Sequence, residues 1–219
     1  MLKHLQRDLD QLKKEILTVG SLVEKAMEKA ERVLSHRDAA LAEEVVAGDK
    51  EIDRRELEVE EDCLKILALH QPVAADLRFI IAVLKVNNDL ERMGDLTKNM
   101  ARRAASLVEG PVLECGTELN RMAAEVRKMV SMSLDALVGT DVDLARKVLD
   151  MDDGIDEANR DLFRRVRDSL IANTEDIERG INAISIARNL ERIGDLATNI
   201  AEDVIFMVDG ELVRHPSLF

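Results

Sequence analysis

The residues of this sequence best suited to chemistry are acidic pairs within a repeated phrase. Segment 90–101 (LERMGDLTKNMA) returns as segment 190–201 (LERIGDLATNIA), with eight of twelve positions identical and two more exchanging Met for Ile. Each copy places a Glu four residues before an Asp, with a Gly directly before that Asp. These residues are Glu91, Gly94 and Asp95 in the first copy and Glu191, Gly194 and Asp195 in the second. A repeat with this spacing indicates a duplicated structural unit.

A second acidic pair stands upstream of each phrase. It consists of Asp49 and Asp53 in the first repeat and of Asp152 and Asp156 in the second. Each pair lies roughly 20 residues before a predicted helix–helix turn, and the Glu–Asp pair lies roughly 20 residues after that turn. In an antiparallel helix pair, equal distances from the turn mean equal heights, here about 30 Å from the turn at roughly 1.5 Å per residue. We therefore expect four carboxylates to converge in each repeat.

Four converging carboxylates need a counter-charge, because like charges repel and raise one another's pKa values. One source is arginine, since five arginines lie near the acidic pairs. They are Arg54, Arg55, Arg92, Arg188 and Arg192. In that case the acids form a solvated stripe joined by salt bridges, which is the usual role of a single acidic pair on a helix.

The other source is a metal ion, which we favour because the pairs recur at matching heights. Each also has a glycine that costs its helix about 1 kcal/mol relative to alanine. The predicted ligands are Asp49, Asp53, Glu91, Asp95, Asp152, Asp156, Glu191 and Asp195, with Glu56, Asn99 and Asn199 nearby. Oxygen ligands suit iron, manganese, magnesium or calcium and argue against zinc or copper.

Helical periodicity positions these residues, and the chain is predicted to be all-α. Apolar residues at three- and four-residue steps run from Leu9 to Leu34, and Asp38 is the expected N-cap of the next helix. The second helix is expected to end near residue 70, and the third and fourth are expected to cover residues 74–108 and 114–138. The fifth is expected to run from Asp141 to about residue 172, and the last to end near residue 208. We expect a tandem repeat of two three-helix bundles, residues 1–109 and 112–219, with six long antiparallel helices. Aromatic residues make up only 2%, so the core must be aliphatic.

Composition excludes several classes of function. A net charge of −13 disfavours nucleic-acid binding and charge-driven docking on anionic lipid. No apolar stretch is long enough to span a membrane, and the first residues lack the apolar core of a signal peptide, so the cytoplasm is the expected location. Cys63 and Cys115 are expected to be free thiols. No nucleotide-binding or nucleophile motif is present, so we expect no catalytic residues and no enzyme activity.

The chain resembles the PhoU family of accessory regulators of bacterial phosphate-specific transport. The resemblance rests on segments 71–78 (QPVAADLR), 88–95 (NDLERMGD), 187–195 (ARNLERIGD), 198–204 (TNIAEDV) and 213–215 (VRH). It implies two similar three-helix bundles whose acidic motifs bind metal, in some members as multinuclear iron clusters. It also implies a cytoplasmic homodimer that represses the phosphate regulon and restrains phosphate uptake. Such a protein links the ATPase subunit of the phosphate ABC transporter to a sensor histidine kinase, and meets the membrane only through these partners.

One departure from the family pattern is visible. Many members carry His directly after the motif aspartate, where this chain has Leu96 and Leu196. Any contribution of that His to metal binding is therefore missing. A metal-dependent phosphate-ester hydrolase or a metal-storage bundle remains the alternative function, with Arg92 and Arg192 as the candidate phosphate-binding groups.

Overall fold

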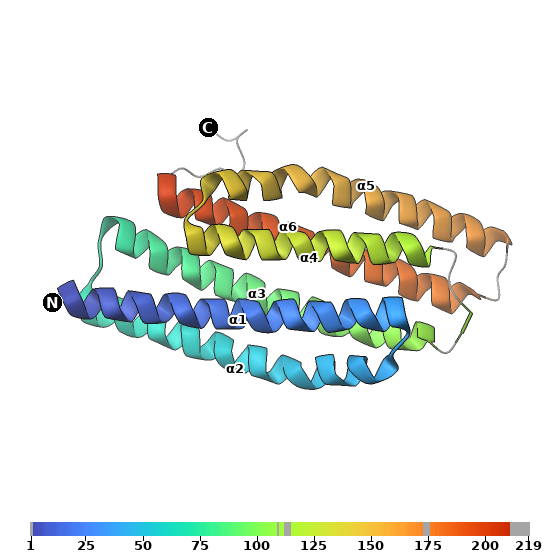
Figure 1. Cartoon of the computed structure of the whole chain (residues 1–219), viewed down its shortest axis with the longest axis horizontal. Coiled ribbons are helices and arrows are strands. Elements are labelled where there is room, and N and C mark those ends of the chain that lie inside the picture. The colour runs from blue at the N-terminus through green and yellow to red at the C-terminus, as the bar shows by residue number, and fades with distance from the viewer. Residues whose placement is uncertain (1, 109, 112–114, 173–175, 211–219) are drawn as a thin grey trace.

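Six helices make up the computed structural model, which describes residues 2–108, 110–111, 115–172 and 176–210. They are α1 Leu2–His36, α2 Ala39–His70, α3 Ala74–Val108, α4 Gly116–Gly139, α5 Val142–Ala172 and α6 Ile177–Asp209. The described residues contain no strand. Figure 1 shows the helices lying along one long axis, with α1–α3 forming one three-helix layer and α4–α6 the other. The prediction of an all-α tandem repeat of antiparallel helices is confirmed.

Local signals start and stop the helices as expected. The backbone N–H of Ala40 donates to the Asp38 carboxylate at 3.2 Å, so Asp38 caps α2. Asp141 does the same for α5, accepting from the Leu144 N–H at 2.9 Å. At the far end of α2, Gln71 adopts a left-handed conformation with φ of 47° and closes the helix. These caps satisfy backbone groups that the helix ends leave without intrahelical partners.

The two bundles share one core. Helix α3 packs against α6 and α1 packs against α4, so the aliphatic faces of both repeats join in a single buried cluster. The face predicted for α1 is buried from Leu9 to Ala30. In the last turn Val33 is fully buried and Leu34 is partly buried against the same core. Steps of three and of four residues from Ala30 both fall on this face, because the helix has about 3.6 residues per turn.

Some predicted boundaries lie outside the described residues. These are the ends of the two predicted bundles at residues 109 and 112, the helix start at 114, the turn at 173–175 and the closing segment 213–215. Helix α4 begins at Gly116 in the described chain. The division at 109 and 112 therefore stays a prediction.

Both cysteines of the chain are buried. Cys63 and Cys115 lie outside any disulfide bond in the described structure. Burial raises the pKa of the Cys63 thiol to about 12, so this sulfur is held as the neutral thiol. None of the helices in the described part of the chain combines the length and apolar character that crossing a membrane requires.

Candidate metal centres

The first quartet consists of Asp49, Asp53, Glu91 and Asp95, and lies where α2 packs against α3. A Cβ atom at Gly94 would lie 3.7 Å from the Asp49 Oδ1 atom. The two acidic pairs therefore stand at the same height in neighbouring helices, as equal distances from the turn predicted. The same Cβ would also lie 3.2 Å from Ile52 Cδ1, so glycine allows α2 to approach α3 closely at this point.

Burial and mutual repulsion act on the acids of the first quartet. Asp49 is only 7% exposed, whereas Asp53 faces solvent. Burial, followed by the charge of Asp49, raises the pKa of Asp53 above its usual value. Burial, followed by the charges of Asp95 and Asp53, does the same to the pKa of Glu91. The carboxylates are thus close enough to repel one another.

Lys98 supplies the counter-charge in the first quartet. Its Nζ atom donates to Asp49 Oδ2 on α2 and to Asp95 Oδ1 on its own helix. Burial of Lys98 lowers its pKa, but the hydrogen bonds to these two carboxylates outweigh that effect and the pKa is raised. The ammonium group therefore stays charged between the two helices.

The second quartet consists of Asp152, Asp156, Glu191 and Asp195, and lies where α5 packs against α6. The Cβ position of Gly194 is 4.0 Å from Asp152 Oδ1, so the acids again stand at matching heights. The nearest atom to this Cβ position is Ile155 Cγ2 at 3.6 Å, an ordinary van der Waals distance. The close approach of Ile52 to Gly94 is therefore not repeated here.

Electrostatic repulsion is less relieved in the second quartet. Burial, followed by the charge of Asp195, raises the pKa of Asp152. Burial also raises the pKa values of Glu191 and Asp195, and other acids of the quartet add to both shifts. Arg192 lowers these last two pKa values without cancelling the rise. Within the described part of the chain, none of the four carboxylates forms an ion pair.

In the described part of the chain, none of the arginines proposed as counter-charges forms an ion pair with a quartet acid. Arg54 and Arg55 each form ion pairs with Glu51 and Glu58 along the outer face of α2. Arg188 of α6 attracts Glu191 only as a lesser electrostatic influence. The arginine alternative therefore does not describe the first quartet, where a lysine performs that role.

The extra oxygen donors are distributed unequally. Glu56 lies near enough to Glu91 to raise its pKa, although burial is the larger influence. Asn99 is exposed, and Asn199 lines a surface hollow with Arg92 and Asp89, which form an ion pair at 3.7 Å.

Two residues that affect the charge of the sites were not predicted from the sequence. Lys98 follows Asp95 by three residues, and Glu202, whose charge helps raise the pKa of Asp152, follows Asp195 by seven. Side chains at these spacings share one helix face. Alignment of the two repeats shows the difference in charge, because Lys98 in the first repeat corresponds to the uncharged Thr198 in the second.

The quartets are convergent but not preformed ligand shells. Among the residues that the structure describes, no three His, Cys, Asp or Glu side chains lie close enough together to hold a metal ion. The second quartet nevertheless fits a hard cation in its donor chemistry, since its members are oxygen donors whose repulsion a cation would relieve. Metal binding by the eight predicted ligands stays a prediction.

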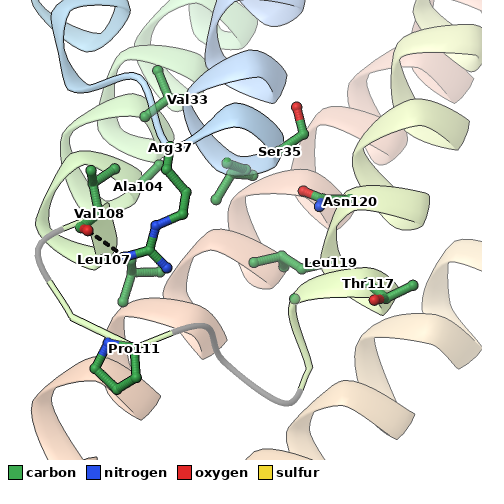
Figure 2. Close-up of a pocket in the computed structure, with 12 residues that line it drawn as sticks. Val33, Ser35, Arg37, Ala104, Leu107, Val108, Pro111, Thr117, Leu119 and Asn120 are labelled. Carbon is green, nitrogen blue, oxygen red and sulfur yellow. Dashed lines mark hydrogen bonds between the residues drawn. The ribbon is translucent and has the colours of Figure 1, made fainter.

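A hollow at the end of α1 lies apart from both quartets. Its volume is about 170 Å³, and it is lined by Arg37, Pro111 and Leu119 among others. Figure 2 shows the Arg37 side chain reaching the backbone carbonyl of Val108, and its guanidinium also donates to the Gly110 carbonyl. Because the Arg37 guanidinium binds backbone carbonyls at the end of α3 and just after it, we assign the hollow a structural role.

Comparison with known proteins extends over nearly the whole chain. The PhoU domain model matches twice, over residues 16–104 and 119–204. The phosphate-specific transport system accessory protein PhoU homolog of Aquifex aeolicus is 38% identical over 211 residues, covering 96% of each chain. The protein of the same description from Pseudomonas aeruginosa is 39% identical over 212 residues, covering 96% of this chain and 88% of that one.

Solved structures agree with this match. The crystal structure of PhoU from Pseudomonas aeruginosa superposes with a TM-score of 0.92 at 38% identity, covering 94% of this chain and 99% of that chain. The phosphate transport system regulatory protein PhoU from Streptococcus pneumoniae gives a TM-score of 0.88 at 30% identity, covering 95% and 99%. The two matched segments contain both acidic quartets in full. The chain therefore belongs to the PhoU domain family.

Proposed function

We propose that this protein is a non-enzymatic regulatory adaptor of phosphate homeostasis that restrains phosphate uptake and represses the phosphate regulon. The observation that carries this proposal is the similarity, over 96% of this chain, to proteins named phosphate-specific transport system accessory proteins. The adaptor acts by binding rather than by turnover. In this role it associates with the phosphate transporter.

The proposed partners are the ATPase subunit of the phosphate ABC transporter and a sensor histidine kinase. The adaptor is a cytoplasmic homodimer that reaches the membrane through these partners. Its net charge of −13 supports docking on basic patches of the partner domains. Charge-driven association weakens as salt rises, because mobile ions screen the attraction.

A bound iron, manganese or magnesium ion is the proposed cofactor of the acidic quartets. Such an ion would offset the repulsion that raises the pKa values of Asp152, Glu191 and Asp195. Because the acids lie on two different helices, an ion held by them would link α5 to α6. Metal supply would then act on the stability of the bundle, since a ligand that binds only the folded state stabilises it.

The regulatory role is tested in cells. Deletion of the gene should give expression of the phosphate regulon even in phosphate-rich medium, and the wild-type chain should restore repression. Membrane pull-downs with the tagged protein should recover the transporter ATPase and the kinase at low salt and lose them at high salt. Normal repression in the deletion strain would refute the proposed role.

The hydrolase alternative has its own test. Purified protein loaded with manganese should release no phosphate from model phosphate esters above the rate of a metal-free control. Turnover at an enzyme-like rate that is lost in Glu91→Gln and Glu191→Gln variants would show that the quartets are catalytic.

A further inference from the structure

The outer side of the groove between α5 and α6 is basic, although the protein as a whole is acidic. An open hollow of about 420 Å³ lies there, and it is lined by Asn159, Arg160, Phe163, Arg164, Ile184 and Arg188. We call these six residues the basic face. Phe163 is 47% exposed, and arginine and aromatic side chains are enriched where proteins bind one another. This face therefore suits a partner surface that is both acidic and apolar.

The arginines of the basic face leave most of their charge unused within the chain. Arg164 pairs with Asp161 of its own helix at an exposed site, where such a pair contributes little. Arg160 donates to the backbone carbonyl of Asp156 at 3.1 Å, and neither Arg160 nor Arg188 forms an ion pair in the part of the chain that the structure describes. Their guanidinium groups remain available for carboxylates of a partner, which arginine can bind through two parallel hydrogen bonds.

The equivalent face of the first repeat carries the opposite charge. Asp53 of α2 corresponds to Asp156 of α5, and Glu91 of α3 corresponds to Glu191 of α6. In this register, the counterparts of the six residues of the basic face are Glu56, Leu57, Glu60, Glu61, Leu84 and Asn88. We call these six residues the acidic face. Three glutamates thus stand where the basic face has an asparagine, a phenylalanine and an arginine, so the two repeats present surfaces of opposite sign.

The acidic face also offers exposed apolar surface and carboxylates that repel one another. Leu57 is 63% exposed. Burial, followed by the charge of Glu60, raises the pKa of Glu56, and Glu60 itself forms no ion pair among the described residues. Glu61 pairs with Lys65 of its own helix at an exposed site. An arginine brought to this face would relieve the repulsion between Glu56 and Glu60.

Both faces point away from α1 and α4. Helix α1 packs against α2 and α3, α4 packs against α5 and α6, and α1 and α4 also contact each other. The outer grooves between α2 and α3 and between α5 and α6 therefore lie on the side of each bundle opposite α1 and α4. Figure 1 shows α2 and α5 at the two long edges of the molecule. A twofold arrangement of two copies can bring each basic face to an acidic face, which closes the assembly as a dimer.

We propose that two copies of this chain associate by docking the basic face of one copy on the acidic face of the other. Copies that each carry a net charge of −13 repel one another overall, so an orientation that joins opposite charges is the one that holds them together. The same contact covers the exposed Phe163 and Leu57. This inference rests on the homodimer of the proposed function and names the surfaces through which its copies meet.

Charge reversal on each face tests the docking, with molar mass measured by light scattering after size-exclusion chromatography. The wild-type chain should elute as a dimer. Arg160→Glu/Arg164→Glu and Glu60→Arg/Glu61→Arg should each weaken association by roughly tenfold or more, because both faces of each variant then carry the same sign. An equimolar mixture of the two variants should form a dimer again, because faces of opposite sign can then meet.

The matched control changes the net charge equally but elsewhere. Arg121→Glu/Lys128→Glu alters two exposed residues of α4 and should leave the dimer intact. Circular dichroism checks that every variant folds. If a reversal variant does not fold, the neutral pair Arg160→Gln/Arg164→Gln takes its place and should also weaken association.

Separate results would overturn the proposal and the homodimer. A wild-type chain that stays monomeric refutes both, while the regulatory role keeps its own cellular test. Reversal variants that remain dimeric, or a mixture of two monomeric variants that forms no dimer, would show that the two faces do not meet, and a wild-type dimer would then stand on other surfaces. If Arg160→Glu/Arg164→Glu stays dimeric but loses the transporter ATPase or the kinase from membrane pull-downs, the basic face serves that partner instead.

Discussion

Replacement of Lys85 by Met should destabilise the protein by loosening the contact between the two bundles. Lys85 of α3 donates to Asp203 of α6 at 2.9 Å, and its ammonium group lies 5.3 Å from the centre of the Phe206 ring. The Asp203 side chain is only 3% exposed, while that of Lys85 is 38% exposed. The substitution removes the cation and leaves the acid buried.

The expected loss follows from these exposures. Removing one partner of a fully buried ion pair costs about 3–5 kcal/mol, whereas an exposed pair contributes about 0–1 kcal/mol. Because water reaches Lys85, we expect the loss of this ion pair to lower the free energy of unfolding by about 2 kcal/mol. The lost contact with the Phe206 ring adds about 0.5 kcal/mol. At roughly 2–4 °C per kcal/mol for a chain of this size, the melting temperature should fall by about 5–10 °C.

Urea and thermal unfolding followed by far-UV circular dichroism measure this loss. The matched control is Lys65→Met, because Lys65 also contacts two carboxylates, Glu61 and Asp62, but on an exposed helix face. That control should cost under about 1 kcal/mol. The double variant with Asp203→Asn should recover part of the loss. If Lys85→Met costs no more than the control, or if the two single losses simply add, the pair does not hold the bundles together.

Three further predictions test other features of the fold. Glu15→Gln should stabilise the protein at neutral pH, because burial raises the Glu15 pKa and the folded state disfavours its charged form. Since the folded chain then binds the proton more tightly than the unfolded chain, this gain should vanish below the ordinary pKa of 4.5, and an equal gain in acid would contradict the reasoning. Gly194→Ala should stabilise α6 by up to about 1 kcal/mol. Gly94→Ala should give no such gain, because its new methyl group would lie 3.2 Å from the Ile52 side chain of α2. Thermal unfolding that finds Gly94→Ala more stable than Gly194→Ala would refute this reasoning. In a Cys115→Ala background, Cys63 should react with a disulfide reagent only after unfolding, and reaction in the native state would show that the thiol is accessible.

The helices and the repeat could be predicted because their signals are local. Asp38 and Asp141 cap helices in the structure as their positions in the sequence suggested. Caps and breaks depend on the backbone of a few neighbouring residues, so they can be recognised without knowledge of the rest of the fold. The convergence of the acids could also be predicted, since height along an antiparallel helix pair depends only on distance from the turn.

The neutralising partner could not be recognised in the same way. Arg54 and Arg55 adjoin the acidic pair in sequence, yet they pair along the outer face of α2. Lys98 lies on another helix and bridges Asp49 and Asp95. Successive residues of a helix point about 100° apart, so the rotation of α3 against α2 decides whether Lys98 or its neighbour faces the acids.

The sequence therefore determined the six helices, their duplication and the height at which the carboxylates meet. The helices follow from local caps and periodicity, the duplication from the repeated segments, and the height from the rise of the helix. Tertiary packing set the charge balance of each quartet and the Lys85–Asp203 contact between the bundles. Those features depend on how whole helices rotate and settle against one another. That rotation is governed by the fit of the shared aliphatic core, to which residues from all six helices contribute at once.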